Sequence, residues 1–201
     1  MCCTKGKCLY ISVIYLLHML QKYDFLEDVT KWRVLAPFLK DPYPLGGGYG
    51  LRELSRITGI STPSLRLHLE RLLRDKIVIS QKVKARKVYI GNQRDERFRY
   101  LKKMHTIHLL YTSGCIEYLV KQCTPDVVIL FGSASRGEDL RDSDIDLYLQ
   151  SDEKDLRLSV FENALRRRVQ LHFSSDFRKL PSELKNNLLN GVILDGYLKV
   201  F

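Results

Sequence analysis

The sequence lacks two features that would point to a membrane or to the outside of the cell. No uninterrupted apolar stretch among its 201 residues approaches the roughly 18 that cross a bilayer. No Cys-x-x-Cys pair occurs, and the number of cysteines is odd. We therefore expect no membrane partner, no disulfide framework, no zinc site and a reducing, cytoplasmic setting. The cysteines are Cys2, Cys3, Cys8, Cys115 and Cys123.

Residues 1–22 have some features of a secretory signal, because lysines precede a mostly apolar stretch. No small-x-small cleavage site follows that stretch, which argues against secretion. The segment is expected to be either a packing helix or an extension ahead of a natural start at Met19. The sequence alone leaves both interpretations open.

Positive charge is concentrated in the first half of the chain. Of the formal net charge of +10, residues 1–92 contribute +9, from 16 Lys and Arg against 7 Asp and Glu. Residues 93–201 contain 17 against 16 and contribute only +1. This asymmetry predicts a polyanion-binding module joined to a second domain with a different task.

Residues 23–92 have the element order of a winged helix-turn-helix domain. Apolar residues recur at helical spacing over residues 51–58 and 62–74. Gly59 lies between these two segments, where a sharp turn would need positive φ. A basic hairpin over residues 78–90 is predicted next. The order resembles a winged helix, and the resemblance implies duplex DNA as a partner.

The candidate DNA-binding surface combines the polar side of the second helix with the hairpin. In a winged helix, the helix would reach base edges and the hairpin cations would contact phosphate. Two alternatives remain open: a merely solvated basic face, or contact with an acidic partner protein. The candidate residues are Ser64, Arg66, His68 and Arg71 on the helix and Lys82, Lys84, Arg86 and Lys87 on the hairpin.

Residues 93–123 predict one or two connecting helices, interrupted near Thr112, Ser113 and Gly114. His105 and His108 lack the spacing of metal ligands and are expected to be structural. Cys115 and Cys123 are expected to be buried thiols.

Residues 124–201 alternate between strand-like and helical stretches. Strands are expected at residues 126–132, 143–150 and 169–174, and helices over residues 153–168 and 176–191. The predicted fold class is α/β (α+β), a small mixed sheet with helices packed on it.

The stretch "GSASRGEDLRDSDIDL" carries the chemistry of this second domain. Gly132 and Ser133 follow a strand directly, so backbone N–H groups can approach a phosphate there, and Arg136 can pair with a triphosphate. Asp144 and Asp146 stand at i and i+2 on the next predicted strand, so both carboxylates face one side. Their repulsion would be relieved by a divalent cation such as Mg²⁺. The loop acids Glu138, Asp139 and Asp142 are expected to be solvated.

The same stretch resembles the signature of the polymerase-β nucleotidyltransferase superfamily, and most closely its minimal nucleotidyltransferase branch. The resemblance implies that Gly132, Ser133 and Arg136 bind the phosphates of a nucleoside triphosphate, with ATP expected. It implies that Asp144 and Asp146 are catalytic and hold Mg²⁺ or Mn²⁺.

One departure from the family pattern concerns the third strand of the domain. The family normally has a third carboxylate there, but "VQLHF" offers only Gln170 and His172 on the expected side. His172 is then the candidate base or an additional, weaker ligand. A nucleotide sensor without turnover is therefore a second interpretation.

The resemblance implies transfer of a nucleoside monophosphate, expected to be AMP, to a hydroxyl group. The acceptor would be a small molecule or a side chain of a partner protein, and some relatives are antitoxins that modify a toxin. The partner would be a toxin-like or a substrate-binding helical protein. The alternative is a DNA-binding regulator whose second domain senses nucleotide, and such regulators are often homodimers.

Overall fold

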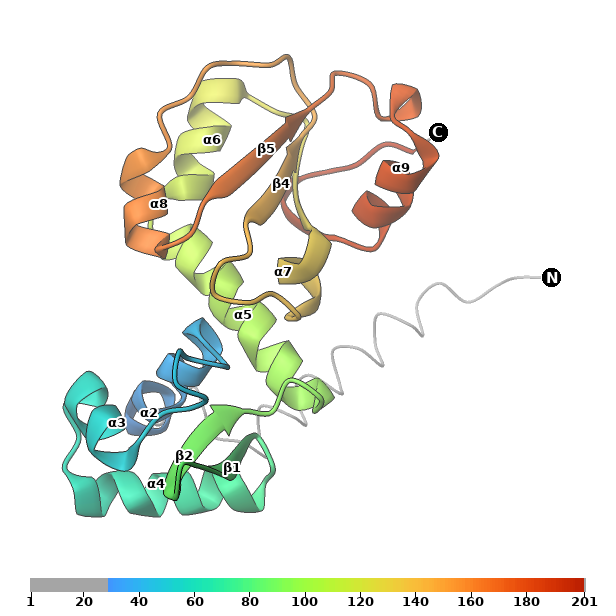
Figure 1. Ribbon diagram of the computed structural model, residues 1–201. Coiled ribbons are helices and arrows are strands. Elements are labelled where there is room, and N and C mark those ends of the chain that lie inside the picture. The colour runs from blue at the N-terminus through green and yellow to red at the C-terminus, as the bar shows by residue number, and fades with distance from the viewer. Residues whose placement is uncertain (1–28, 201) are drawn as a thin grey trace.

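A helix of 17 residues, α5 (Glu96–Thr112), joins two groups of elements in the computed structural model of the chain (Figure 1). The structure describes residues 29–200. The predictions for residues 1–22, and for residues 23–28 of the first domain, lie outside the described residues. Within residues 29–200, no helix is both long enough and apolar enough to cross a membrane.

The group before α5 contains three helices and a hairpin. The helices are α2 (Val29–Lys40), α3 (Leu51–Thr58) and α4 (Thr62–Arg74), and the strands are β1 (Val78–Val83) and β2 (Arg86–Gly91). One apolar core joins them, including Phe38, Leu54, Leu65 and Leu69. Gly59 ends α3 at φ 67°, the left-handed conformation that the predicted turn requires.

The hairpin is longer than the β-rich runs of the sequence suggest. Strands β1 and β2 pair antiparallel from Val78↔Gly91 to Val83↔Arg86. The two residues between them, Lys84 and Ala85, have φ of 45° and 64°. Two successive positive φ values are the pattern of a type I′ turn, whose twist matches that of the strands.

Helix α5 contributes to the cores of both groups. Phe98, near its beginning, packs in the core of the first group, and Leu110, near its end, packs in the core of the second. The chain breaks at Ser113 and Gly114, as predicted, before α6 (Cys115–Cys123). Both cysteines of α6 are buried free thiols.

The second group is built on a mixed four-stranded sheet in the order β5-β4-β3-β6. Its strands are β3 (Val127–Phe131), β4 (Ile145–Leu149), β5 (Val169–Phe173) and β6 (Val192–Gly196). Strand β3 is antiparallel to both β4 and β6, whereas β4 and β5 are parallel. This arrangement confirms the predicted mixed α/β fold.

Each face of the sheet has its own core. Helices α6 and α8 (Ser159–Leu165), with the end of α5, cover one face through Ile116, Leu165 and Leu110. The short helix η1 (Phe177–Lys179) and helix α9 (Ser182–Leu189) pack on the other through Phe177 and Leu188. Because side chains alternate along a strand, β4 directs Ile145, Leu147 and Leu149 to the first face and Tyr148 to the second.

Three elements differ from the sequence-based expectation. The helix predicted over residues 176–191 is divided into η1 and α9, because Leu180 and Pro181 between them are extended. The helix predicted over residues 153–168 is confined to α8, because the preceding segment runs in irregular conformation and packs Leu156 and Leu158 against the core. Strand β6 was not predicted, although Val192 and Ile193 are β-branched residues that follow a glycine.

The buried His105 of α5 makes stability depend on pH. Its two ring nitrogens have no hydrogen-bond partner, and its ring meets Trp32 edge-on at 5.5 Å. Burial, with smaller contributions from Lys40 and His108, lowers the pKa of His105 to about 4. Folding therefore requires the neutral imidazole.

We predict that stability is fully present above about pH 6.5, the ordinary pKa of histidine, and falls as the pH drops toward 4. The loss due to His105 amounts to about 3 kcal/mol. Urea unfolding between pH 4 and 7 measures this loss. His105→Leu should lack this component of the pH dependence. His108→Leu, which removes an exposed side chain with only a smaller contribution to the shift, should retain most of it. Equal pH dependence in the wild type and His105→Leu would contradict the assignment.

Candidate functional site

The turn after β3 begins the candidate site. Gly132 has φ 70° and starts α7 (Gly132–Arg136), a helix of 5 residues. Ser135 Oγ donates to the Gly132 carbonyl at 2.8 Å, which closes the turn. Arg136 points to solvent and is paired with Glu138 at 2.7 Å. This exposed pair is weak, so the Arg136 guanidinium can turn to another anion.

Gly132 is in close contact with Asp146 of β4. A Cβ atom added to Gly132 would lie 2.4 Å from Asp146 Oδ2, far inside van der Waals contact. Residue 132 must therefore lack a side chain for the Asp146 carboxylate to occupy this position. The predicted phosphate-binding turn and the predicted metal-binding carboxylate meet at this point.

Asp146 and His172 share one face of the sheet. His172 Nε2 lies 3.8 Å from Asp146 Oδ1, which is longer than a hydrogen bond but close enough for an electrostatic interaction. The His172 ring also packs edge-on against Phe131, with centroids 5.1 Å apart. Gln170 is the direct neighbour of Asp146 in the parallel register of β4 and β5, and its side chain is exposed.

Asp144 lies one residue before β4 rather than within it, and its side chain is exposed. Burial raises the pKa of Asp146, and the negative charge of Asp144 raises it further, while His172 and Arg167 oppose the shift. A bound cation would relieve the same repulsion. The charge of Asp144 therefore acts on the Asp146 carboxylate, although Asp144 lies outside the strand on which the i and i+2 spacing placed both.

The predicted site residues fit a divalent cation through hard carboxylate oxygens, with an imidazole nitrogen nearby. Within residues 29–200, however, no group of three or more His, Cys, Asp or Glu side chains is arranged to hold a metal ion. A cation at Asp144 and Asp146 would thus need further oxygen ligands, which nucleotide phosphates or water can supply.

One loop acid was wrongly expected to be solvated. Glu138 and Asp142 are exposed, but Asp139 is buried, with 1% of its surface accessible. Asp139 Oδ2 accepts a hydrogen bond from Lys102 Nζ and one from Arg167 Nη1, each at 2.6 Å. Two cations compensate for the cost of burying this carboxylate, which is the physical reason that the expectation failed.

Sequence reasoning also missed Lys102 and Arg167. Lys102 lies on α5 beside Lys103, and lysines in a charged helix are normally solvated. Arg167 belongs to the run Arg166–Arg168, which was assigned to a helix end. Their partner Asp139 is 37 and 28 residues away, so no local pattern connects the three.

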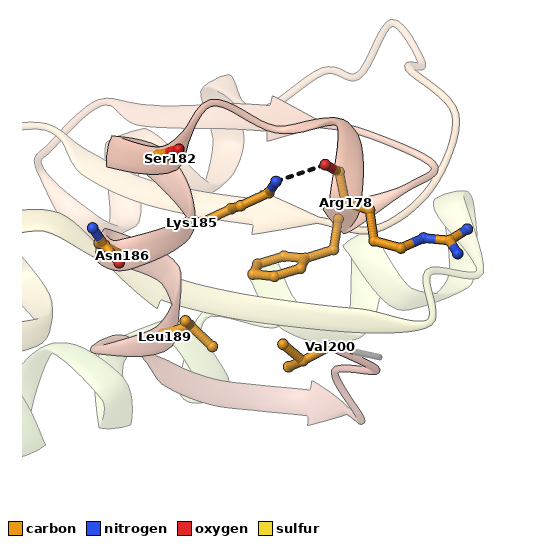
Figure 2. Close-up of a pocket in the computed structure, with 7 residues that line it drawn as sticks. Arg178, Ser182, Lys185, Asn186, Leu189 and Val200 are labelled. Atoms are coloured by element: carbon orange, nitrogen blue, oxygen red, sulfur yellow. Dashed lines mark hydrogen bonds between the residues drawn. The ribbon is translucent and has the colours of Figure 1, made fainter.

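A pocket of about 320 Å³ opens between η1, α9 and the C-terminal segment (Figure 2). Its base is the buried Phe177, from the core that also contains Phe131 and Tyr148. Lys185 Nζ reaches across to the carbonyl of Arg178 at 2.6 Å. The lining contains two basic residues and no acid, and no predicted nucleotide-binding residue belongs to it. It consists of Phe177, Arg178, Ser182, Lys185, Asn186, Leu189 and Val200.

The eight candidate DNA-binding residues divide into three groups in the first part of the fold. Ser64, His68 and Arg71 follow one another at helical spacing and share one side of α4, whereas Arg66 lies on the other side of the buried stripe of that helix. The four hairpin cations are all exposed, and Lys87 Nζ lies 5.6 Å from the centre of the Tyr89 ring. The hairpin cations are Lys82, Lys84, Arg86 and Lys87.

Comparison with known proteins bears on the second part of the chain. Residues 114–198 match the family model described as "Polymerase beta, Nucleotidyltransferase". The matched region begins at the turn before α6 and ends beyond β6, so it contains the whole four-stranded sheet and the site described above. The match supports the nucleotidyltransferase superfamily for this region. Searches of curated proteins and of solved structures gave no match.

The contact between Gly132 and Asp146 predicts the effect of Gly132→Ala. The added methyl group would displace the Asp146 carboxylate and would strain the backbone at φ 70°. We expect a loss of about 1 kcal/mol in stability from the backbone and a loss of at least tenfold, on the order of 1.4 kcal/mol, in affinity for ATP with Mn²⁺, measured by calorimetry.

Gly114→Ala is the matched control, because Gly114 has φ 77° with no atom within 4 Å of the added Cβ. This variant should show the stability loss alone. Equal nucleotide affinity in the two variants would show that the contact with Asp146 has no role in binding.

Proposed function

We propose that the second part of the chain is a metal-dependent nucleotidyltransferase that transfers a nucleoside monophosphate, AMP in the first instance, to a hydroxyl acceptor. The observation that carries the proposal is the contact of Asp146 with Gly132, because it joins a turn suited to phosphate with an acid suited to a cation. The family match over residues 114–198 supports nucleotidyl transfer as the general reaction.

In this proposal the turn at Gly132 and Ser133 receives the triphosphate, and Arg136 leaves Glu138 to pair with it. Asp144 and Asp146 would hold Mg²⁺ or Mn²⁺, which when bound offsets negative charge on the triphosphate. The acceptor oxygen forms a bond to the α-phosphorus, the bond from that phosphorus to the bridging oxygen breaks, and pyrophosphate leaves.

His172 is the proposed base for the proton of the acceptor hydroxyl. It lies on the same face as Asp146, at 3.8 Å, and its ring is held against Phe131. An imidazole can accept a proton near neutral pH, which suits this role. The neighbouring Gln170 can only form hydrogen bonds.

A second candidate function is nucleotide sensing without turnover. The observation that favours it is β5, where the two side chains on the side of Asp146, Gln170 and His172, are not acidic, although the family that the chain resembles has a third carboxylate on this strand. A domain of this kind would bind nucleotide and cation through the same residues and release no product.

We also propose that residues 29–91 form a winged helix that binds duplex DNA. The order of three helices and a hairpin supports it, as do the four exposed cations of the hairpin. A protein that binds its own operator and modifies a partner protein would combine both parts, as an antitoxin does. The acceptor would then be a hydroxyl side chain of that partner.

Transfer can be tested with ATP labelled at the α-phosphate, incubated with the full chain, Mg²⁺ and an extract of the source cells. We expect label in an acceptor and release of pyrophosphate.

Asp144→Asn with Asp146→Asn should reduce labelling by at least about a hundredfold, since both proposed cation ligands are removed. Asp152→Asn with Asp155→Asn, two exposed acids in the segment before α8, should label like the wild type. Equal labelling by both double variants would remove Asp144 and Asp146 from the mechanism. ATP binding without any labelled product would favour the sensor.

DNA binding predicts a specific dependence on salt. Replacement of Lys82, Lys84 and Lys87 by Gln should weaken duplex binding and reduce the slope of log affinity against log salt by as much as about 0.9 for each phosphate that is no longer neutralised. The matched variant replaces three exposed cations of the second part by Gln and should keep the wild-type slope of log affinity against log salt. These cations are Arg157, Lys179 and Lys199. Binding to duplex DNA that is undetectable even at low salt would contradict the proposal.

A further inference from the structure

The loop between α7 and β4 is held from both sides by buried charge. Asp139, in the middle of this loop, receives Lys102 Nζ from α5 and Arg167 Nη1 from the segment between α8 and β5, both at 2.6 Å. The side-chain exposures are 2% for Lys102, 0% for Asp139 and 11% for Arg167. The loop that ends at Asp144 is therefore anchored on two different elements.

Arg167 also holds the two residues that precede β4. Its Nε donates to the carbonyl of Ser143 at 2.8 Å, and its Nη2 donates to the carbonyl of Asp144 at 3.0 Å. Next along the chain, the N–H of Ile145 donates to the carbonyl of Arg168 at 2.9 Å. The backbone on both sides of the Asp144 side chain is thus fixed, although the side chain itself is exposed.

This arrangement is costly if it serves stability alone. Both cations contact the same oxygen of Asp139, and the buried Oδ1 has no hydrogen-bond partner. Apolar residues of similar size often stabilise a protein as well as a buried ion network does. Apolar residues could not replace the three N–H donors of the planar Arg167 guanidinium, which reach one carboxylate and two backbone carbonyls. The hydrogen bonds of Arg167 therefore orient the backbone of the loop before β4.

We propose that Arg167, supported by Asp139 and Lys102, is a positioning residue that fixes the direction of the Asp144 carboxylate relative to Asp146. The inference rests on the proposed function for the role of those two carboxylates, and it assigns no contact of Arg167 with substrate. Side chains that orient a ligating group strongly affect cation affinity because they remove the cost of ordering it at the moment of binding.

Arg167 also places a positive charge against the backbone of Asp144. A lysine at position 167 would keep most of this charge, but its single ammonium group cannot reach Asp139 and both carbonyls together. Arg167→Lys therefore separates orientation from charge.

The test compares the full chain with Arg167→Lys and Arg168→Lys. Arg168 is the matched control, because its side chain is exposed and only its backbone contacts the loop. Mn²⁺ alone is titrated and followed by electron paramagnetic resonance, and amide hydrogen exchange is measured on the same three proteins. Thermal unfolding and exchange in residues 29–91 report whether each variant is folded.

In Arg167→Lys we expect Mn²⁺ affinity to fall about tenfold, and exchange over residues 140–146 to rise on the order of tenfold, while residues 29–91 stay protected. Arg168→Lys should match the wild type in both measurements. The inference is overturned if the loop amides of a folded Arg167→Lys protein exchange at the wild-type rate. It is also overturned if this variant binds Mn²⁺ as tightly as the wild type does. If the wild type binds Mn²⁺ neither alone nor in the presence of ATP, the proposed function fails, and loop exchange alone decides whether Arg167 orders the loop.

Discussion

The buried carboxylate of Asp139 is the interaction on which the arrangement of this protein depends. A lone carboxylate in the interior would be strongly unfavourable, so the chain must bring cations to it. One comes from α5, the helix that contributes to both cores, and the other comes from the segment that leads into β5. Burial lowers the pKa of Lys102, and the negative charge of Asp139 opposes that shift. The loop, the long helix and the sheet are thereby fixed relative to one another.

The candidate site follows from a second constraint, the alternation of side chains along β4. The residues at 145, 147 and 149 fill one core, which leaves position 146 on the face with Tyr148. The turn after β3 passes so close to Asp146 that only glycine fits there. An acid, a backbone turn and an imidazole therefore lie together where β3 ends beside β4. Phosphate and cation chemistry is the use that this combination of groups supports best.

The first part of the fold depends on its hairpin in a different way. Lys84 and Ala85 both have positive φ, a conformation that costs energy for residues other than glycine and asparagine. The turn nevertheless places a lysine at the tip of the hairpin, beside three other exposed cations. The positive φ values of these two residues are the backbone cost of the tight turn that carries this cation.

Local patterns in the sequence predicted most of the elements and the main site residues. An apolar run located β3, helical spacing located α4, and turn residues located the break at Gly114, because each signal lies within a few residues of the chain. The phosphate-binding turn and the acidic pair were predicted separately, and the contact of Gly132 with Asp146 was not predicted. The Asp139 network was not predicted, because its partners are far apart in sequence and each resembles an ordinary surface charge. Strand β6 was missed although its β-branched residues gave a usable signal.

The central claim is that Asp144 and Asp146 hold a cation while the turn at Gly132 holds phosphate. Crystals of the full chain grown with Mn²⁺ and a non-hydrolysable ATP analogue, measured for the anomalous signal of manganese, test this claim most directly. The account predicts an anomalous peak between the two carboxylates, with the phosphates over Gly132 and Ser133 and the Arg136 guanidinium turned toward them. Nucleotide bound elsewhere, or manganese absent from Asp144 and Asp146 in crystals that contain the nucleotide, would contradict it.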